Sequence, residues 1–446
     1  MKGLSTGIKS TMKSKWLIFI LILLLGAAIR FYALGDSSFW IDEAISATAA
    51  DQILHQGIPV FASGELYSRS LVFHYLMAGA LFFSHTEFAA RSISVIFGLA
   101  TSVLIFYCGR IFGKETAWIS FILFTFLEIT IVYSREARMY QATMFLFFLT
   151  LYLMYEKKLT LACISFLFAF DTHPVAALLA PILLYELWKG KANKLLFGVI
   201  GFITAYGMIG FLFSLKNIWV MHLLAYLWHI KYYFPFAAVS VIGMIMSWRH
   251  RFSSMLFLSI FLVLLAGFLN SLFAYRYIYL IFFPIIIFAS IALSKVRGKY
   301  VILGVYMVIT SNLILPFSYT FVLIPAKISH YDPTAPYADF RSAYAHLPNL
   351  PFVATFTPAA AFYSRNPDYW LNFSFSGRND SWLIKNGKEI YTGATVAYGI
   401  DDLPDSFVAV IDRWGFGKLD PSVQTFINNC VPLYEAENIG VVQCSQ

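Results

Sequence analysis

The first long apolar run of the chain is WLIFILILLLGAAIRFYAL, residues 16–34. Its length is close to the ~20 residues that a helix needs to cross a bilayer. The run continues toward Trp40 without the small-residue pattern of a cleavage site, so we interpret it as a retained span and not as a removed signal. The sequence therefore predicts a membrane protein from its first helix onward.

The composition extends this interpretation to the whole chain of 446 residues. Hydrophobic residues make up 59% of it and charged residues 13%, and the mean hydropathy is +0.70. Because no soluble fold needs so large an apolar share, we expect an α-helical polytopic membrane protein. The net charge of +8 comes from short basic clusters between apolar runs and no nucleic-acid-binding motif accompanies it, so we expect membrane lipids, and no nucleic acid, as partners.

The basic clusters predict the topology. Lys and Arg near the ends of spans favour the cytoplasmic side, so we place the clusters within 2–15, 110–114, 157–158, 189–194, 249–251 and 295–299 inside. An even number of crossings between clusters then gives a cytoplasmic N-terminus, an extracytoplasmic C-terminal segment and about eleven transmembrane helices. The predicted spans are 16–34, 92–110, 117–134, 139–155, 159–171, 174–188, 195–214, 232–247, 255–271, 277–294 and 300–319.

The apolar stretch 71–83 is too short for a crossing, and counting it as one would move Arg110 outside. We expect it to be an outer juxtamembrane helix that lies along the interface. The region 159–188 is divided by Asp171-Thr172-His173-Pro174, and we retain two short crossings there because Lys157 and Lys189 should share a side.

Composition changes near Pro325, where long apolar runs stop. We therefore divide the chain into a transmembrane domain, 1–324, with its first outer loop at 35–91, and an extracytoplasmic α/β domain, 325–446. Strands are expected at 352–356 and 406–411 and around Leu433 and Val441, with helices at 357–364 and 421–429.

Two of the four cysteines fall in this last segment. Cys430 and Cys444 flank a predicted hairpin, and the pattern favours a disulfide between them over two unpaired thiols. Cys108 and Cys163 fall in predicted spans, where we expect small core residues.

On the predicted topology, unusual charges gather on the outer face. Asp42 and Glu43 follow the first span, and arginines occur at positions 69, 91, 135, 138 and 276. The arginines could anchor helix ends at the headgroups, and the acidic pair could cap the next helix. The other interpretation is a reaction site at the membrane surface, because the positive-inside rule predicts few arginines there.

The segment Ser38–Ala47, which contains Trp40-Ile41-Asp42-Glu43-Ala44, resembles the first outer loop of the family C glycosyltransferases. The nearest groups are the bacterial and archaeal relatives of protein O-mannosyltransferase and of the aminoarabinose transferase that modifies lipid A. Phe88–Ser92, Tyr133–Tyr140 and Arg276-Tyr277 follow in the order and at the intervals of that family. The resemblance covers the chain through about residue 293 and implies a GT-C fold.

The resemblance also implies a reaction. A sugar carried on a polyprenyl phosphate, dolichyl or undecaprenyl, would pass with inversion to a protein, lipid or glycan acceptor on the outer face. Asp42 matches the family's catalytic carboxylate, which takes the proton of the acceptor hydroxyl. The leaving lipid phosphate needs fixed positive charge and no general acid, and its candidates are Arg135, Arg138 and Arg276. Glu43, Arg91, Tyr140 and Tyr277 complete the candidate substrate-binding residues.

Some relatives hold a divalent metal ion with an outer histidine and a carboxylate, so Glu43, His173 and His229 are the metal candidates. Ordinary hydrogen-bonded histidines are the alternative. The chain departs from the family at Tyr67-Ser68-Arg69-Ser70-Leu71, where relatives carry a proline-containing motif.

Two other functions handle the same lipid. A transporter or flippase would bind a polyprenyl-linked saccharide without chemistry, but would be expected to show two related halves with broken helices, which the sequence lacks. A glycan ligase would keep the enzyme class and transfer a preassembled saccharide. The enzyme interpretation is favoured, with Asp42 as its base.

Overall fold

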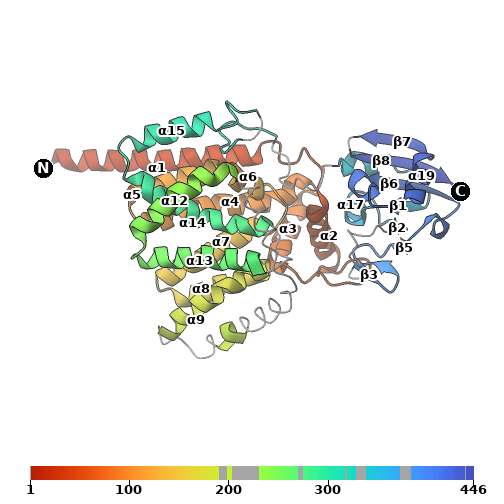
Figure 1. Cartoon of the computed structure of the whole chain (residues 1–446), viewed down its shortest axis with the longest axis horizontal. Helices are drawn as coiled ribbons and strands as arrows, with labels where there is room; N and C mark the ends of the chain where they lie inside the picture. The colour runs from red at the N-terminus through yellow and green to blue at the C-terminus, as the bar shows by residue number, and fades with distance from the viewer. Residues whose placement is uncertain are drawn as a thin grey trace. The chain divides into compact units, whose positions relative to one another are not determined.

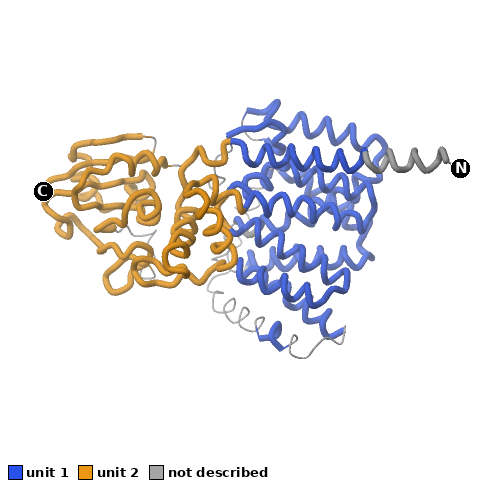
Figure 2. The backbone as a smooth tube through the Cα atoms, turned by 180° about the vertical axis from the view of Figure 1, so that it is seen from behind, with its two compact units in different colours: residues 1–32, 94–135, 139–327 blue, residues 33–93, 136–138, 328–446 orange. Residues whose placement is uncertain are grey.

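The computed structural model describes residues 2–189, 198–202, 231–269, 275–316, 319–327, 338–371, 383–436 and 438–446. The chain forms two compact units (Figure 2). Unit 1 comprises residues 1–32, 94–135 and 139–327, and unit 2 comprises residues 33–93, 136–138 and 328–446. The outer loop at 35–91 thus groups with the C-terminal segment, while the division into a catalytic domain, 1–324, and an extracytoplasmic domain, 325–446, stays a prediction.

Unit 1 is helical. Figure 1 shows α5, α7, α12, α13 and α14 running side by side. The elements of this unit are α1 (Lys2–Phe31), α5 (Lys114–Phe126), α6 (Glu128–Ser134), α7 (Tyr140–Tyr155), α8 (Leu159–Thr172), η1 (Pro174–Leu179), α9 (Ala180–Lys189), η2 (Lys231–Tyr233), α12 (Phe234–Ser247), α13 (Arg251–Leu269), η3 (Tyr275–Ile281), α14 (Phe282–Ser294) and α15 (Lys299–Ile309). α4 (Glu87–Arg110) belongs to unit 2 through residue 93 and to unit 1 beyond it.

Gly243 permits the close contact between α12 and α14. A Cβ atom at this position would lie 1.8 Å from the carbonyl oxygen of Phe288. Small residues let the backbones of packed membrane helices approach in this way. A larger residue at 243 would therefore push the two helices apart.

Within the described residues, three helices are long and apolar enough to cross a membrane, at Ser14–Phe31, Glu87–Arg110 and Arg251–Phe268. Other apolar helices, including α7, α8, α12 and α15, are shorter. Large apolar side chains point outward from several of them, as at Leu24 and Val301. Such surfaces suit lipid. The total of about eleven spans stays a prediction, and the span expected at 195–214 lies largely outside the described residues.

Two predicted spans differ from the helices found. The span expected at 117–134 is broken at Leu127, which has an extended backbone between α5 and α6. The segment 320–322 supplies the hydrogen bonds that the helix lacks at this break. The Val322 N–H donates to Phe126 O at 2.9 Å, and the Glu128 N–H donates to Thr320 O at 2.9 Å. The span expected at 300–319 ends as a helix at Ile309. After it, the Thr320 N–H donates to Thr310 O at 2.8 Å and the Asn312 N–H donates to Phe321 O at 3.0 Å in place of helical hydrogen bonds.

Unit 2 begins with α2 (Ile41–Gln56) and α3 (Leu71–Phe83). α3 confirms the helix predicted at 71–83, while its place at the interface stays a prediction. α2 ends at Gly57, whose φ of 77° is a left-handed conformation that suits glycine, and the Gly57 N–H donates to Ile53 O.

The C-terminal part of unit 2 is built on one sheet. Its strands are β1 (Phe352–Ala354), β2 (Tyr369–Leu371), β3 (Ile384–Lys385), β4 (Lys388–Glu389), β5 (Thr395–Ala397), β6 (Ser406–Asp412), β7 (Val431–Ala436) and β8 (Ile439–Ser445). Their order in the described chain is β3-β4-β5-β2-β1-β6-β8-β7, with β5, β2, β1 and β6 parallel and antiparallel strands at both edges.

The helices of this part are α16 (Phe340–Tyr344), α17 (Thr357–Tyr363), η5 (Ile400–Asp402), α18 (Arg413–Phe416) and α19 (Pro421–Asn428). The expected α/β architecture is therefore present, and β1, α17, β6, α19, β7 and β8 lie close to their predicted positions. Apolar side chains of β6 and α19, such as Phe407 and Val423, form the core. α17 packs against α2 within unit 2.

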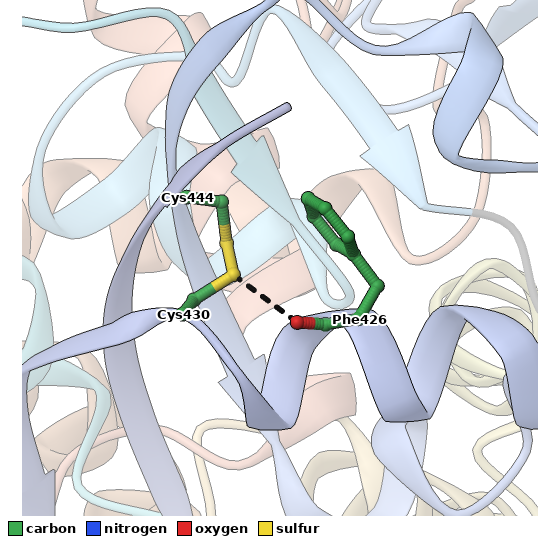
Figure 3. Close-up of a disulfide and its surroundings, with 3 residues drawn as sticks. All are labelled: Phe426, Cys430 and Cys444. Atoms are coloured by element: carbon green, nitrogen blue, oxygen red, sulfur yellow. Dashed lines mark hydrogen bonds between the residues drawn. A yellow bond between two sulfur atoms is a disulfide. The ribbon is translucent and has the colours of Figure 1, made fainter.

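Cys430 and Cys444 are joined by a disulfide between the end of α19 and β8 (Figure 3). Their Cα atoms lie 4.8 Å apart. Cys430 follows the last turn of α19, whose Phe426 carbonyl lies 3.5 Å from its sulfur. Cys108 and Cys163 are buried free thiols, as expected for core residues.

Candidate functional site

The amino end of α2 carries both candidate acids. Trp40 has an extended backbone, and its N–H donates to Glu43 Oε2 at 3.3 Å. Acidic side chains in a first helical turn also interact favourably with the helix dipole. This local capping fixes where the helix begins, and it places Asp42 and Glu43 on different sides of its first turn.

Glu43 forms a buried ion pair with Arg91. The Arg91 Nε donates to Oε1 at 2.9 Å and Nη2 donates to Oε2 at 2.7 Å. The side chains are only 6% and 2% exposed, with Glu43 the more buried. Glu43 Oε1 also accepts the backbone N–H of Ala137 at 2.6 Å. Glu43 therefore joins α2 to the start of α4 and to the segment 136–138.

Arg91 holds the loop that precedes α2. Its Nη1 donates to the carbonyls of Leu34 and Ser37 at 2.9 and 2.8 Å, and its Nη2 donates to the Ser38 carbonyl at 3.1 Å. Its guanidinium also lies 5.3 Å from the centre of the Phe39 ring. These contacts give Glu43 and Arg91 a structural role at the start of α2, and the substrate contact expected from the sequence stays a prediction.

Asp42 instead faces Arg138. Arg138 Nη2 lies 3.7 Å from Asp42 Oδ2, and the Asp42 side chain is 20% exposed. Arg138 Nη1 donates to the backbone carbonyl of Asp42 at 2.9 Å and to Ser46 Oγ at 2.6 Å. The structure thus brings a partly accessible carboxylate and an oriented guanidinium together, which is an arrangement suited to proton transfer beside an anionic group.

Ser46 is a residue that the sequence analysis missed. It lies one helical turn after Asp42, so both can reach one guanidinium from the same face of α2. The four-residue spacing was visible in the sequence, but the arginine partner was not.

An electrostatic interaction links Asp42 to Tyr391 in the C-terminal part of unit 2. Tyr391 packs on Phe61 with ring centres 5.3 Å apart, and Phe61 packs on Tyr67 at 5.5 Å. Burial raises the pKa of Tyr391, the charges of Tyr67, Glu389 and Asp42 raise it further, and Arg69 lowers it. The Tyr391 hydroxyl therefore shares an electrostatic environment with Asp42.

Arg135, Tyr140 and Arg276 belong to unit 1. Arg135 Nη1 donates to the carbonyls of Ile29, Arg30 and Tyr32 at 3.2, 2.9 and 2.6 Å, which satisfies the carboxyl end of α1. This contact gives Arg135 a structural role at the end of α1, and its expected phosphate contact stays a prediction.

Arg276 lies over the Tyr140 ring, with its guanidinium carbon 5.6 Å from the ring centre. The Tyr133 ring lies 6.0 Å from that of Tyr140 and stacks on Tyr279 at 4.3 Å. Tyr277 lies in η3, and only its backbone is described. The candidate residues thus form one group in unit 2 and another in unit 1.

Arg30 was also missed by the sequence analysis. It is fully buried in the apolar run of α1, where its Nε donates to Ser134 Oγ at 3.0 Å and its Nη1 donates to Thr125 O at 2.8 Å. A single arginine inside a predicted span was the available signal. It fixes α1 against α5 and α6.

No protein-family model and no curated protein matches this chain. Among solved structures, ArnT from Cupriavidus metallidurans in the apo state is similar, with a TM-score of 0.62 at 12% identity over 97% of this chain and 98% of that one. The same ArnT bound to undecaprenyl phosphate gives a TM-score of 0.59 at 12% identity over 95% and 98%.

The chain has the ArnT fold. ArnT is a GT-C protein, so the GT-C architecture expected from the sequence is supported, while a closer relation to the O-mannosyltransferases stays a prediction. Because the match covers 97% of this chain, the ArnT fold includes the C-terminal sheet, which lies beyond the part covered by the sequence resemblance. Together with the apolar helices, the ArnT fold identifies a membrane protein.

The metal candidates do not come together in the described residues. No group of three or more His, Cys, Asp or Glu side chains is placed there to hold a metal ion. His173 Nδ1 accepts the Val175 N–H at 3.1 Å and so caps η1, Glu43 pairs with Arg91, and His229 lies outside the described residues.

Proposed function

We propose that this protein is an inverting glycosyltransferase that moves a sugar from a polyprenyl phosphate to an acceptor hydroxyl on the outer side of the membrane. The observation that carries the proposal is the distance of 3.7 Å between Asp42 Oδ2 and Arg138 Nη2 at the amino end of α2. The ArnT fold supports it, because a similar ArnT binds undecaprenyl phosphate.

In the proposed reaction Asp42 is the general base. The acceptor oxygen attacks the anomeric carbon, and its proton passes to Asp42 as the new glycosidic bond forms. The bond between the anomeric carbon and the phosphate oxygen breaks, and its electron pair leaves with the lipid phosphate. That phosphate is stable as an anion, so it needs no proton from the protein.

Arg138 is the proposed stabiliser of the leaving phosphate. Ser46 and the Asp42 carbonyl hold Nη1, so the guanidinium is oriented before the charge develops. A planar guanidinium also matches phosphate oxygens better than an ammonium group does. Glu43 and Arg91 are proposed to position Asp42, and Arg135 to secure α1. Arg276 and Tyr140 stay proposed donor-binding residues.

We further propose a cytoplasmic N-terminus and a C-terminal domain outside the cytoplasm. This topology places Asp42 on the outer side of the membrane, where the donor sugar and the acceptor would meet. The acceptor class is a protein, lipid or glycan that presents a hydroxyl group. An undecaprenyl or dolichyl chain would lie in the apolar part of unit 1, which supplies the surface that a soluble enzyme lacks.

The test is turnover by purified protein supplied with a panel of undecaprenyl-phosphate sugars and lipid or glycan acceptors. Release of undecaprenyl phosphate is measured by mass spectrometry. Asp42→Asn should lose about 10²- to 10⁴-fold in turnover, since it removes the base. Asp51→Asn is the matched control, because Asp51 lies later on α2 and pairs with His85.

Full turnover by Asp42→Asn would exclude this carboxylate as the base. Movement of the intact donor across vesicles, without release of undecaprenyl phosphate, would favour the flippase. Transfer of a preassembled saccharide, with no transfer of single sugars, would favour the ligase.

A further inference from the structure

Tyr363 joins the C-terminal sheet domain to the loop that precedes the acids Asp42 and Glu43. Its hydroxyl accepts the backbone N–H of Phe39 at 2.7 Å and donates to Glu87 Oε1 at 2.7 Å. Tyr363 ends α17, whereas Phe39 lies three residues before Asp42. One hydroxyl group therefore bridges segments more than 300 positions apart, as the separation of 324 between Phe39 and Tyr363 shows.

Glu87 also forms an ion pair with Arg341 of the same domain. Arg341 Nε and Nη2 lie 2.9 and 2.7 Å from its Oε1, and Arg341 Nη2 also donates to the Gly35 carbonyl at 2.8 Å. Glu87 is buried in the first turn of α4. Arg91, which binds Glu43, follows on the next turn of that helix. The first two turns of α4 thus bind the sheet domain and the amino end of α2.

The loop before Asp42 makes further contacts with the sheet domain. Ser38 Oγ donates to the Ala338 carbonyl at 2.9 Å and accepts the Phe340 N–H at 3.1 Å. The Phe39 ring packs on Phe362 at 4.9 Å between ring centres. Later on α2, Thr48 Oγ1 donates to the Pro358 carbonyl at 3.1 Å.

We propose that Tyr363 is a positioning residue for Asp42, through the Phe39 amide and Glu87, and that the C-terminal domain is in this way part of the reaction site. This inference rests on the proposed function. Tyr363 acts through the backbone of the loop and is not itself a catalytic residue. Its hydroxyl restrains the start of α2, so its loss lets Asp42 depart from the geometry that proton transfer needs.

The experiment compares Tyr363→Phe with Tyr344→Phe in the full-length protein. Tyr344 is the matched control, because its ring stacks on that of Tyr363 at 6.4 Å while its hydroxyl donates to Phe356 O at 3.1 Å, within the sheet domain and not to the loop before α2. Each variant removes one oxygen atom from the same domain. Hydrogen exchange of the peptide that contains Phe39 and Asp42 is measured beside turnover.

Tyr363→Phe should speed exchange of this peptide and lower kcat, each by about tenfold, with the KM for the donor nearly unchanged. Tyr344→Phe should change neither, although both variants should lose similar thermal stability. Unchanged exchange and kcat in Tyr363→Phe, or equal changes in both variants, would overturn the proposal. The exchange result does not depend on activity, so it still tests the contact if Asp42→Asn disproves the proposed reaction.

Discussion

Both carboxylate oxygens of Glu43 accept hydrogen bonds from Arg91, at 2.9 and 2.7 Å, in a nearly solvent-free site. Glu43 and its sequence neighbour Asp42 therefore have different surroundings and different roles. Glu43 is neutralised and immobilised, whereas Asp42 keeps contact with solvent beside Arg138. A base must reach its substrate, so the more accessible acid is the better candidate.

Removing one member of the buried pair should destabilise the protein strongly. Arg91→Met leaves the Glu43 charge uncompensated, which should cost about 3–5 kcal/mol of unfolding free energy. The double variant Glu43→Leu, Arg91→Met should lose less than the two single losses added together. Thermal unfolding in detergent provides the measurement, with Arg69→Met on the exposed Arg69 as the control.

Two arginines three positions apart should respond differently to the same substitution. Arg138→Gln should lower kcat by about 10²- to 10³-fold, because the proposed leaving phosphate loses its fixed cation. Arg135→Gln should mainly lower the unfolding midpoint, because Arg135 satisfies carbonyls at the end of α1. Turnover and unfolding are measured on both variants, and an equal kcat loss in the two would contradict this division of roles.

The sequence correctly predicted those helices and strands whose ends are marked by residues close to them in the chain. The Asp420-Pro421 pair marked the start of α19, and Asp420 accepts the Ser422 N–H at 2.9 Å. The strands β2 to β5 have only two or three residues each, so no alternation can develop, and they were missed. β1 is equally short, but it was predicted from the largely apolar run Phe352–Phe356. The place of β2 to β5 depends on pairing with distant strands.

The sequence predicted several residues of the candidate site, but not which partner each of them contacts. Asp42 and Glu43 look alike in the sequence, and their difference arises from Arg91, 48 positions away from Glu43. Arg135 and Arg138 look alike as well, but one meets the end of α1 and the other meets α2. Tyr363 carried no local signal, since its partners Phe39 and Glu87 are distant in the chain.

His85 predicts a pH dependence of stability. Its hydrogen bond to Asp51 at 3.0 Å, with the charge of the same carboxylate and that of Glu87, raises the pKa of His85 above 6.5 against the opposing effect of burial. The folded state therefore favours protonated His85. This stabilisation is fully present below pH 6.5 and is lost as the pH rises through the raised pKa.

The unfolding midpoint should therefore fall as the pH rises above about 6.5, the ordinary pKa of histidine, and His85→Gln should flatten that slope. The effect should stay below about 1 kcal/mol and shrink in high salt, because the pair is partly exposed. His55→Gln is the control, since the more exposed His55 lies 3.6 Å from the same Asp51. An unchanged slope in His85→Gln would refute the assignment.

The disulfide predicts a stability effect confined to the C-terminal domain. Cys430 and Cys444 are separated by 14 positions and join α19 to β8. Closing a loop of about 15 residues limits the unfolded chain and contributes about 3 kcal/mol. The double variant Cys430→Ser, Cys444→Ser should therefore speed hydrogen exchange in β7 and β8 and leave exchange in α12 and α14 unchanged. The variant Cys108→Ser, Cys163→Ser keeps the disulfide and serves as the control, so its exchange in β7 and β8 should match the wild type. If the protein without the disulfide also exchanges there at the wild-type rate, the bond contributes little.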